Sequence, residues 1–383
     1  MNATATLLDE ATSAAPVRKP QLPALTGVRT LLAVNIMFFH FTPPHMQLIY
    51  PLINNSYVFV GFFILLSGFV LAYNYADRPR LVKRDFWLAR FARLYPIYLL
   101  SLVLFVNMLA VEYHARSTGQ FWAGLLLTPL LLQGWHPLLA TFWNTVAWTL
   151  SCEAALYFAF PWIVKLPWPK TPGKLAALLI GIWCAGLVPH AIYMVFNPDN
   201  LPIPIDRYSY GFWLRALKYT PLAYVCTFLA GVTLAKLQSS LRISSGQRTA
   251  VAALSLLGIA IFFGCAVEHV PYILMHGGLL VPIFSALVIG LSGQNIFATA
   301  FSVRPLMLLG QASYALFLLH FNFINLLREY NIPQRLHLAA FDPWISYVAT
   351  LLLSIAAMYF VERPARQLIL KYKREPQPAG KEM

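Results

Sequence analysis

The feature that most constrains this chain is a series of long, almost uninterrupted apolar runs. A bilayer core of about 30 Å is spanned by roughly 20 mostly apolar helical residues. Runs of about that length recur ten times, and we expect each of them to form a transmembrane helix. The predicted spans are Leu25–Phe41, Leu52–Tyr75, Leu94–Val111, Val146–Val164, Leu175–Phe196, Tyr219–Ala235, Thr249–Val267, Tyr272–Leu291, Leu306–Leu327 and Trp344–Val361.

Composition excludes the soluble alternatives. The chain is 59% hydrophobic and only 11% charged, whereas an ordinary soluble domain is about 45–50% apolar and about 25% charged. The run Phe121–Leu132 contains Pro129 and is too short to span, so it is predicted to enter the membrane and return. The predicted fold is therefore an all-α, polytopic transmembrane helical bundle of about ten spans with one short re-entrant helix.

The charge distribution predicts the orientation of this bundle. A net charge of +14 would suggest nucleic acid only if the basic residues shared one water-facing surface. Instead, most of the 28 Lys and Arg residues fall in connections on one side, including the segment from Arg78 to Arg93. Cytoplasmic loops carry such an excess. We therefore expect membrane lipid around the bundle, no nucleic acid as a partner, and both termini in the cytoplasm.

The two ends of the chain differ from the apolar part. Residues 1–23 lack a basic start followed by an apolar segment, so no cleaved signal peptide is expected and they are predicted to be a disordered cytoplasmic tail. Residues 24–370 are predicted to be one membrane domain. Residues 371–383 are predicted to be a basic cytoplasmic tail.

Ionisable residues inside the predicted spans are candidate functional groups, because a charge in a span costs at least a few kcal/mol. Arg29 and His40 lie on one face of the first span, separated by a rise of about 16 Å. Glu153 lies in the predicted span Val146–Val164, and a carboxylate beside an imidazole raises its basicity. The structural alternatives are that Arg29 reaches lipid phosphate, His40 bonds a carbonyl, and Glu153 pairs with a buried donor. No His, Cys, Asp or Glu cluster has the spacing of a metal site.

Arg90 and Arg93 stand three residues apart, just before the predicted span Leu94–Val111. On a helix they point the same way and can grip phosphate oxygens as a fork. The alternative is a plain basic flank of the membrane. Ser67 precedes Gly68 in the second span, where a neighbouring helix could pack closely.

Taken in order, six motifs resemble the acyltransferase-3 family of integral-membrane O-acyltransferases. The resemblance runs from about Pro23 to Leu370. The motifs are Arg29-x10-His40, FFILLSGF at Phe62–Phe69, Arg90-x-x-Arg93, WTLSCE at Trp148–Glu153, SYALFLLH at Ser313–His320, and Glu362-Arg-Pro.

The resemblance implies a multi-pass enzyme of the bacterial inner (plasma) membrane that takes an acyl group from acyl-CoA, usually acetyl-CoA. It implies His40 as general base or acyl carrier, Glu153 as its orienting group, and no metal. Arg29, Arg90 and Arg93 would hold the phosphates of the coenzyme. The residues expected to line the substrate cavity are Ser67, Trp148, Ser151, Tyr314 and His320.

The acceptor stays open at this point. A hydroxyl of a cell-surface glycan, an exopolysaccharide or a lipid-linked saccharide precursor is the first expectation. A small secreted metabolite such as a macrolide sugar is the second. A secondary transporter would also carry intramembrane His, Glu and Arg, but no inverted repeat is evident. A glycan flippase is a further alternative, which predicts that His40→Ala leaves function intact.

Overall fold

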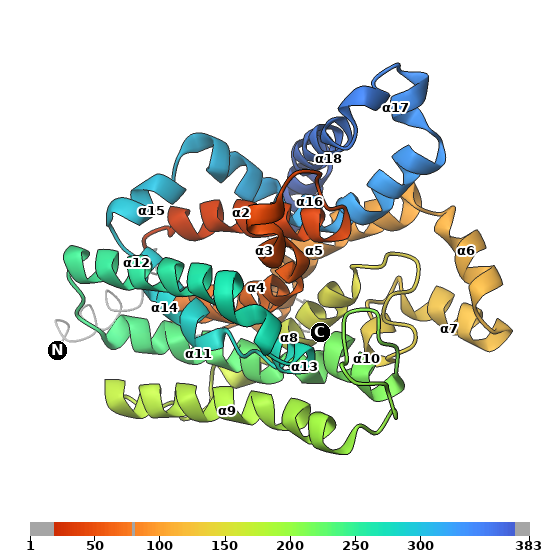
Figure 1. Cartoon of the computed structure of the whole chain (residues 1–383). Helices are drawn as coiled ribbons and strands as arrows, with labels where there is room; N and C mark the ends of the chain where they lie inside the picture. Colours follow the sequence, from red (N-terminus) through yellow and green to blue (C-terminus); the bar gives the residue numbers. More distant parts are fainter. Residues whose placement is uncertain (1–18, 79–80, 372–383) are drawn as a thin grey trace, which may run out of the picture.

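The computed structural model describes residues 19–78 and 81–371, and these residues form helices and turns without any β-strand (Figure 1). The long helices are α2 (Pro23–His40), α4 (Phe59–Tyr75), α5 (Lys83–Leu104), α8 (Trp148–Ile163), α9 (Pro172–Phe196), α11 (Val225–Ser240), α12 (Ser245–Ile261), α14 (Val281–Leu291), α16 (Arg304–Glu329) and α18 (Trp344–Ala357). The shorter helices are α3 (Tyr50–Asn54), α6 (Met108–Ala115), α7 (Thr118–Leu127), α10 (Phe212–Tyr219), α13 (Tyr272–His276), α15 (Ile296–Phe301), α17 (Ile332–Arg335) and α19 (Arg363–Lys371). The predicted tails, residues 1–23 and 371–383, fall almost wholly outside the described residues.

Each of the ten predicted spans coincides with a helix or a pair of consecutive helices. Eight helical segments of the described chain are long and apolar enough to cross a membrane. The predicted spans that begin at Leu25 and at Val146 are not among the eight, and they correspond to α2 and α8. The all-α fold is confirmed, and these helices identify a multi-pass integral membrane protein.

The boundaries of two predicted spans, Leu94–Val111 and Leu52–Tyr75, differ from those of the helices. Helix α5 begins at Lys83, well before the predicted start at Leu94, and ends at Leu104. The span predicted from Leu52 begins only at Ser56, because the chain turns between α3 and α4. The helix α5 includes Arg90 and Arg93, and both side chains line a cavity inside the protein.

Helix α7 has 10 residues. At a rise of 1.5 Å per residue it is about 15 Å long, which is about half the thickness of a bilayer core. Its length agrees with the prediction that the run Phe121–Leu132 does not span.

Burial separates central from peripheral helices. In α4, 67% of the apolar window is buried, whereas in α9 only 17% is buried. Figure 1 shows α9 at one edge of the bundle, and α17 and α18 at the opposite edge. The exposed face of α9 carries large apolar side chains such as Ile180 and Val188, as expected for a helix that contacts lipid.

Glycines allow the central helices to approach closely. A Cβ atom added to Gly68 of α4 would collide with the carbonyl oxygen of Phe228 in α11, and one added to Gly231 of α11 would collide with that of Leu65 in α4. This confirms the predicted close-packing site beside Ser67. Gly310 of α16 gives the same close approach to α2. Close packing therefore fixes α4 against α11 and α16 against α2, and α2, α4 and α16 carry five of the ten candidate residues.

Candidate functional site

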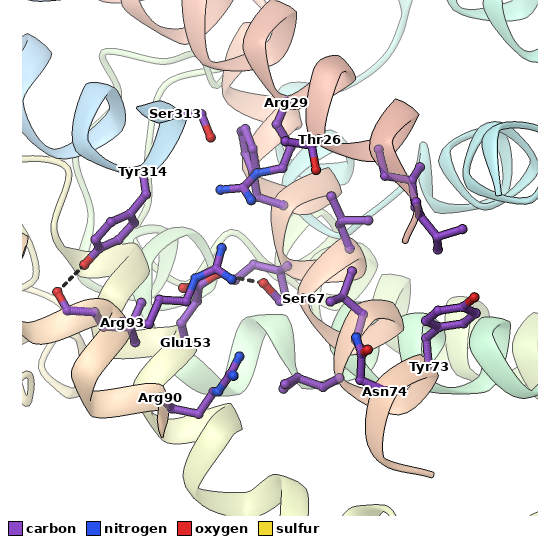
Figure 2. A pocket seen from close by; sticks show the side chains of 18 of the residues that line it. Thr26, Arg29, Ser67, Tyr73, Asn74, Arg90, Arg93, Glu153, Ser313 and Tyr314 are labelled. Carbon is purple, nitrogen blue, oxygen red and sulfur yellow. Dashed lines mark hydrogen bonds between the residues drawn. The ribbon is translucent and has the colours of Figure 1, made fainter. Parts of the chain in front are cut away.

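A cavity of about 350 Å³ opens between α2, α4, α5, α8 and α16 (Figure 2). Residues 19–23, which precede α2, lie at its edge together with Tyr73 and Asn74 at the end of α4. Of the residues predicted from the sequence, six line the cavity: Arg29, Ser67, Arg90, Arg93, Glu153 and Tyr314.

Three guanidinium groups enter this cavity from two helices. Figure 2 shows Arg29 on α2, and Arg90 and Arg93 on α5, with their side chains directed into the same space. None of the three forms a salt bridge or donates a hydrogen bond to a described residue, and the Nε atom of Arg90 is buried without a partner. Because buried polar groups are normally satisfied, this arrangement is typical of a site for an anionic ligand.

Glu153 is the acidic residue that lines the cavity within the described chain. Its Oε1 accepts a hydrogen bond of 2.8 Å from the Ser67 hydroxyl, which in turn accepts one of 3.2 Å from the Tyr157 hydroxyl. The positive charges of Arg93 and Arg29 also act electrostatically on this carboxylate, although neither arginine lies within salt-bridge distance of it. Tyr157 was not predicted, but it stands four residues after Glu153 and therefore on the same helix face.

Tyr314 forms part of the cavity wall. Its hydroxyl donates a hydrogen bond of 2.6 Å to the carbonyl oxygen of Leu94 in α5. This bond ties α16 to the helix that carries Arg90 and Arg93.

His40 lies outside the cavity, at the last residue of α2. Its ring centroid is 5.2 Å from that of His320 and 4.9 Å from that of Phe321, both on α16. Neither nitrogen of its ring forms a hydrogen bond within the described part of the protein. The predicted contact between Glu153 and His40 is not made, because α8 directs Glu153 toward Ser67 and the arginines.

His320 is the polar group next to His40. It is fully buried, and its Nδ1 lies 2.9 Å from the carbonyl oxygen of Phe317 and 3.2 Å from that of Leu316. A carbonyl oxygen only accepts, so Nδ1 carries the proton and a neutral ring keeps its lone pair on Nε2. That Nε2 is buried and has no partner among the described residues. His320 was predicted to line the substrate cavity, but it lies beyond it.

Two phenylalanines stand between the cavity and the histidine pair. Phe63 and Phe317 both line the cavity, and their ring centroids are 6.4 Å apart. On one side the guanidinium carbon of Arg29 lies 5.9 Å from the ring of Phe63. On the other side the ring of Phe317 lies 6.1 Å from that of His320. The path from the arginines to His40 is therefore closed by aromatic side chains in this conformation.

Trp148 and Ser151 were expected to line the cavity, and the structure corrects this. The Trp148 ring packs against Tyr219 and Tyr224, with centroid distances of 5.0 and 5.6 Å. The Ser151 hydroxyl donates to the carbonyl oxygen of Leu131 at 2.6 Å and accepts from the backbone of Gly134 at 3.2 Å. Neither residue lines the cavity: Ser151 attaches the segment that follows α7 to α8, and Trp148 packs α8 against the end of α10 and the residues that follow it.

No cluster of three His, Cys, Asp or Glu suited to a metal ion occurs among residues 19–78 and 81–371. The polar side chains that line the cavity carry three guanidinium groups, the ammonium group of Lys19, one carboxylate, two amides and several hydroxyl groups. Guanidinium groups cannot ligate a metal but bind phosphate well.

Comparison with known proteins agrees with this chemistry. The chain is 27% identical over 331 residues to acyltransferase MdmB of Streptomyces mycarofaciens, a match that covers 81% of each chain. It is 23% identical to the peptidoglycan O-acetyltransferase OatA of Listeria monocytogenes and 24% identical to the putative peptidoglycan O-acetyltransferase YrhL of Bacillus subtilis. These two matches cover 90% of this chain but only 56% and 55% of the relatives, so the chain spans a little over half of their length. No solved structure matches.

The family profile described as "Acyltransferase domain" matches residues 22–363, which include α2 through the end of the last predicted span. The chain therefore belongs to the acyltransferase-3 family of membrane acyltransferases.

Proposed function

We propose that this acyltransferase transfers an acyl group, in the first instance acetyl, from cytoplasmic acyl-CoA to a hydroxyl of a glycan. The glycan is a cell-surface or exopolysaccharide chain or its lipid-linked precursor. The observation that carries the proposal is the convergence of three guanidinium groups, unpaired within the described chain, on one cavity. The similarity to OatA, a peptidoglycan O-acetyltransferase, and to YrhL, a putative one, supports a glycan as acceptor.

The coenzyme end of acyl-CoA carries several phosphate charges. Arg90 and Arg93 bind these charges as a fork from α5, and Arg29 binds from α2, because arginine matches phosphate oxygens in bidentate geometry. Residues 19–23 form the rim of the cavity, so the donor enters past them. In this orientation, ten helices cross the bilayer, α7 is re-entrant, and the arginine end faces the cytoplasm with both termini.

Glu153 has a positioning role in this proposal. Its carboxylate reduces the repulsion between Arg29 and Arg93, and Ser67 and Tyr157 fix its own orientation. A guanidinium group held in this way is preorganised for phosphate, which lowers the entropy lost on binding.

His40 is the catalytic base. It removes the proton from the acceptor hydroxyl as the oxygen attacks the thioester carbonyl, and it returns that proton to the thiolate of CoA when the carbon–sulfur bond breaks. The products are an ester and free CoA. The alternative route first places the acyl group on the imidazole and releases CoA before the acceptor binds.

His320 takes the orienting role that the sequence assigned to Glu153. Its protonated Nδ1 is committed to backbone carbonyl oxygens, so its Nε2 can accept a hydrogen bond. The adjacent His40 ring is the group that can donate one after a small rotation, and this bond would fix the tautomer of His40. A rotation of Phe63 or Phe317 brings the thioester to His40.

The decisive experiment measures release of CoA thiol by purified protein in nanodiscs, given acetyl-CoA and a glycan fraction from the cell surface. Mass spectrometry of the same glycan, with and without the gene, checks for the mass of one acetyl substituent. A secondary transporter would release no CoA yet move solute across vesicles. Stoichiometric CoA release and acetylated glycan are expected, and their absence with every glycan fraction contradicts the proposal.

A small secreted metabolite such as a macrolide sugar is the second candidate acceptor. It is favoured by the match to MdmB, which covers the same large share of both chains, whereas OatA and YrhL extend far beyond the matched part. Mass spectrometry of the culture medium distinguishes the two acceptors. If the acceptor is a secreted metabolite, that metabolite loses an acetyl group when the gene is removed, whereas the cell-surface glycan does not change.

A further inference from the structure

A second basic cluster lies near the C-terminal end of α2, where His40 stands. The arginine cavity lies along the N-terminal part of the same helix. The second cluster consists of Arg207, Arg215 and Lys218, which come from the connection after α9 and from α10. None of the three lines the cavity of the proposed donor site. None forms a salt bridge within the described residues.

Arg207 places positive charge beside the proposed catalytic base. Its guanidinium carbon lies 4.2 Å from the ring centroid of Phe39, and the Phe39 ring lies 5.0 Å from that of His40. Its Nη1 donates a hydrogen bond of 2.8 Å to Asn54. Its other donors have no acceptor in the part of the chain that the structure describes.

Lys218 is buried, and its ammonium group has no acceptor among residues 19–78 and 81–371. The residue is 4% exposed, and its Nζ lies 5.0 Å from the ring centroid of Tyr272 and 5.3 Å from that of Tyr219. Burial and the nearby charge of Arg215 lower the pKa of Lys218 to about 8, so the ammonium form still predominates at neutral pH. Burying an ammonium ion without a partner costs several kcal/mol, which an anionic ligand would offset.

Aromatic rings connect the two cations. Tyr57 lies 5.8 Å from Phe39 and 5.0 Å from Tyr272 between ring centroids, and it stacks on His276 at 4.7 Å. The Nε2 of His276 is buried and has no partner in the described chain. A continuous series of aromatic contacts thus runs from His40 through Phe39, Tyr57 and Tyr272 to Lys218, and the His276 ring beside it has an unused hydrogen-bonding nitrogen.

The acidic residues of this region do not neutralise the cations. Asp206 accepts hydrogen bonds from the backbone of Tyr208 and Ser209 and from the Ser209 hydroxyl. Asp199 accepts from the Tyr193 hydroxyl and from the backbone of α10. Asp206 is therefore bonded within its own loop and Asp199 to α9 and α10, although Asp206 is near enough to act on Lys218 electrostatically.

We propose that Arg207 and Lys218 form an acceptor subsite that binds an anionic group, a carboxylate or a phosphate, on the sugar to be acylated. The cations fix the anionic group, the rings of Phe39, Tyr57 and Tyr272 cover the apolar face of the sugar, and the reacting hydroxyl then lies at His40. This inference rests on the proposed function and narrows the acceptor to an acidic or phosphorylated saccharide.

The test measures sugar binding by saturation-transfer NMR on the full-length protein in nanodiscs. The protein carries Arg90→Ala and Arg93→Ala, so that the first cavity does not compete for the probe. The probes are glucose 6-phosphate, glucuronic acid and glucose. At least one charged sugar should bind tenfold or more tightly than glucose, and the stronger of the two identifies phosphate or carboxylate.

Adding Arg207→Ala or Lys218→Met should weaken binding of that charged sugar tenfold or more. Arg335→Ala, which removes an exposed arginine of α17, should leave it unchanged. Equal binding of all three sugars, no binding of any, or insensitivity to both variants overturns the inference. Acyl-CoA binding and CoA release by the protein with both arginines intact report separately on the proposed function, so either proposal can fail alone.

Discussion

Replacing Arg93 by alanine removes a guanidinium group that makes no hydrogen bond or salt bridge to the described protein. The side chain points into the cavity beside Glu153 and lies one helical turn from Arg90 (Figure 2). Its loss therefore breaks no hydrogen bond or salt bridge of the described chain. It removes a proposed partner for the phosphates of the donor and a positive charge that acts on Glu153.

A hydrogen bond to a charged group contributes about 1.5–3 kcal/mol. Loss of that amount weakens the affinity for acyl-CoA about 10- to 150-fold. Stability should change little, because relief of the repulsion between Arg90 and Arg93, roughly 0.2–0.5 kcal/mol for like charges three residues apart, opposes the loss of the attraction between Arg93 and Glu153. Arg93→Lys keeps the charge but loses the fork, so its loss of affinity should be smaller.

The assay is titration calorimetry of purified protein in nanodiscs with CoA, paired with thermal unfolding. Arg84→Ala is the matched control, because Arg84 lies on the same helix and is exposed outside the cavity. The control should bind CoA as the unaltered protein does. An unchanged affinity in Arg93→Ala would refute the assignment of the donor site, and so would a loss of affinity that matches a loss of folded protein.

Three further predictions concern packing, positioning and charge. Gly231→Ala should lower the free energy of unfolding by about 1–3 kcal/mol, since its methyl group would meet the backbone of α4, whereas Gly61→Ala, which has open space, should be tolerated in the same unfolding measurement. His320→Leu should lower the turnover number roughly tenfold for the loss of about 1.4 kcal/mol, with CoA affinity unchanged. His320→Gln should recover part of that rate in the same kinetic assay, because the glutamine amide oxygen can accept a hydrogen bond. If the His320→Leu and His320→Gln variants turn over at the same rate, the positioning role is excluded. Lys218→Met should raise the thermal unfolding midpoint, because an unpaired buried charge is removed, and a lower midpoint would show that the ammonium group stabilises the fold.

The positions of the helices could be predicted from the sequence because long apolar runs leave a chain few other structures. The start of α5 could not be predicted in this way. The predicted span begins at Leu94 because charged residues precede it. In the structure Arg90 and Arg93 line an internal cavity, and the helix extends back to Lys83.

The convergence of Arg29, Arg90 and Arg93 on one site was predicted from their motifs, and the structure brings them to one cavity. The predicted pairing of Glu153 with His40 is not made, and Glu153 lies with the arginines instead. Depth along a helix follows from residue number, but the direction in which α8 faces depends on its packing against other helices. Instead, the Ser67 hydroxyl donates a hydrogen bond to the Glu153 carboxylate, and His320 lies beside His40.

Arg207 illustrates a different limit of prediction from sequence. It lies in a connecting segment without a motif, and its sequence neighbours give no reason to place it near His40. Only the folded chain brings its guanidinium group over Phe39.

The central claim is that His40 performs the transfer while the arginine cavity binds the donor. Purified His40→Ala protein should bind CoA with unchanged affinity, yet transfer labelled acetyl groups about 10²- to 10⁴-fold more slowly, the usual contribution of a general base. Transfer within threefold of the unaltered rate, with CoA still bound, would contradict the account.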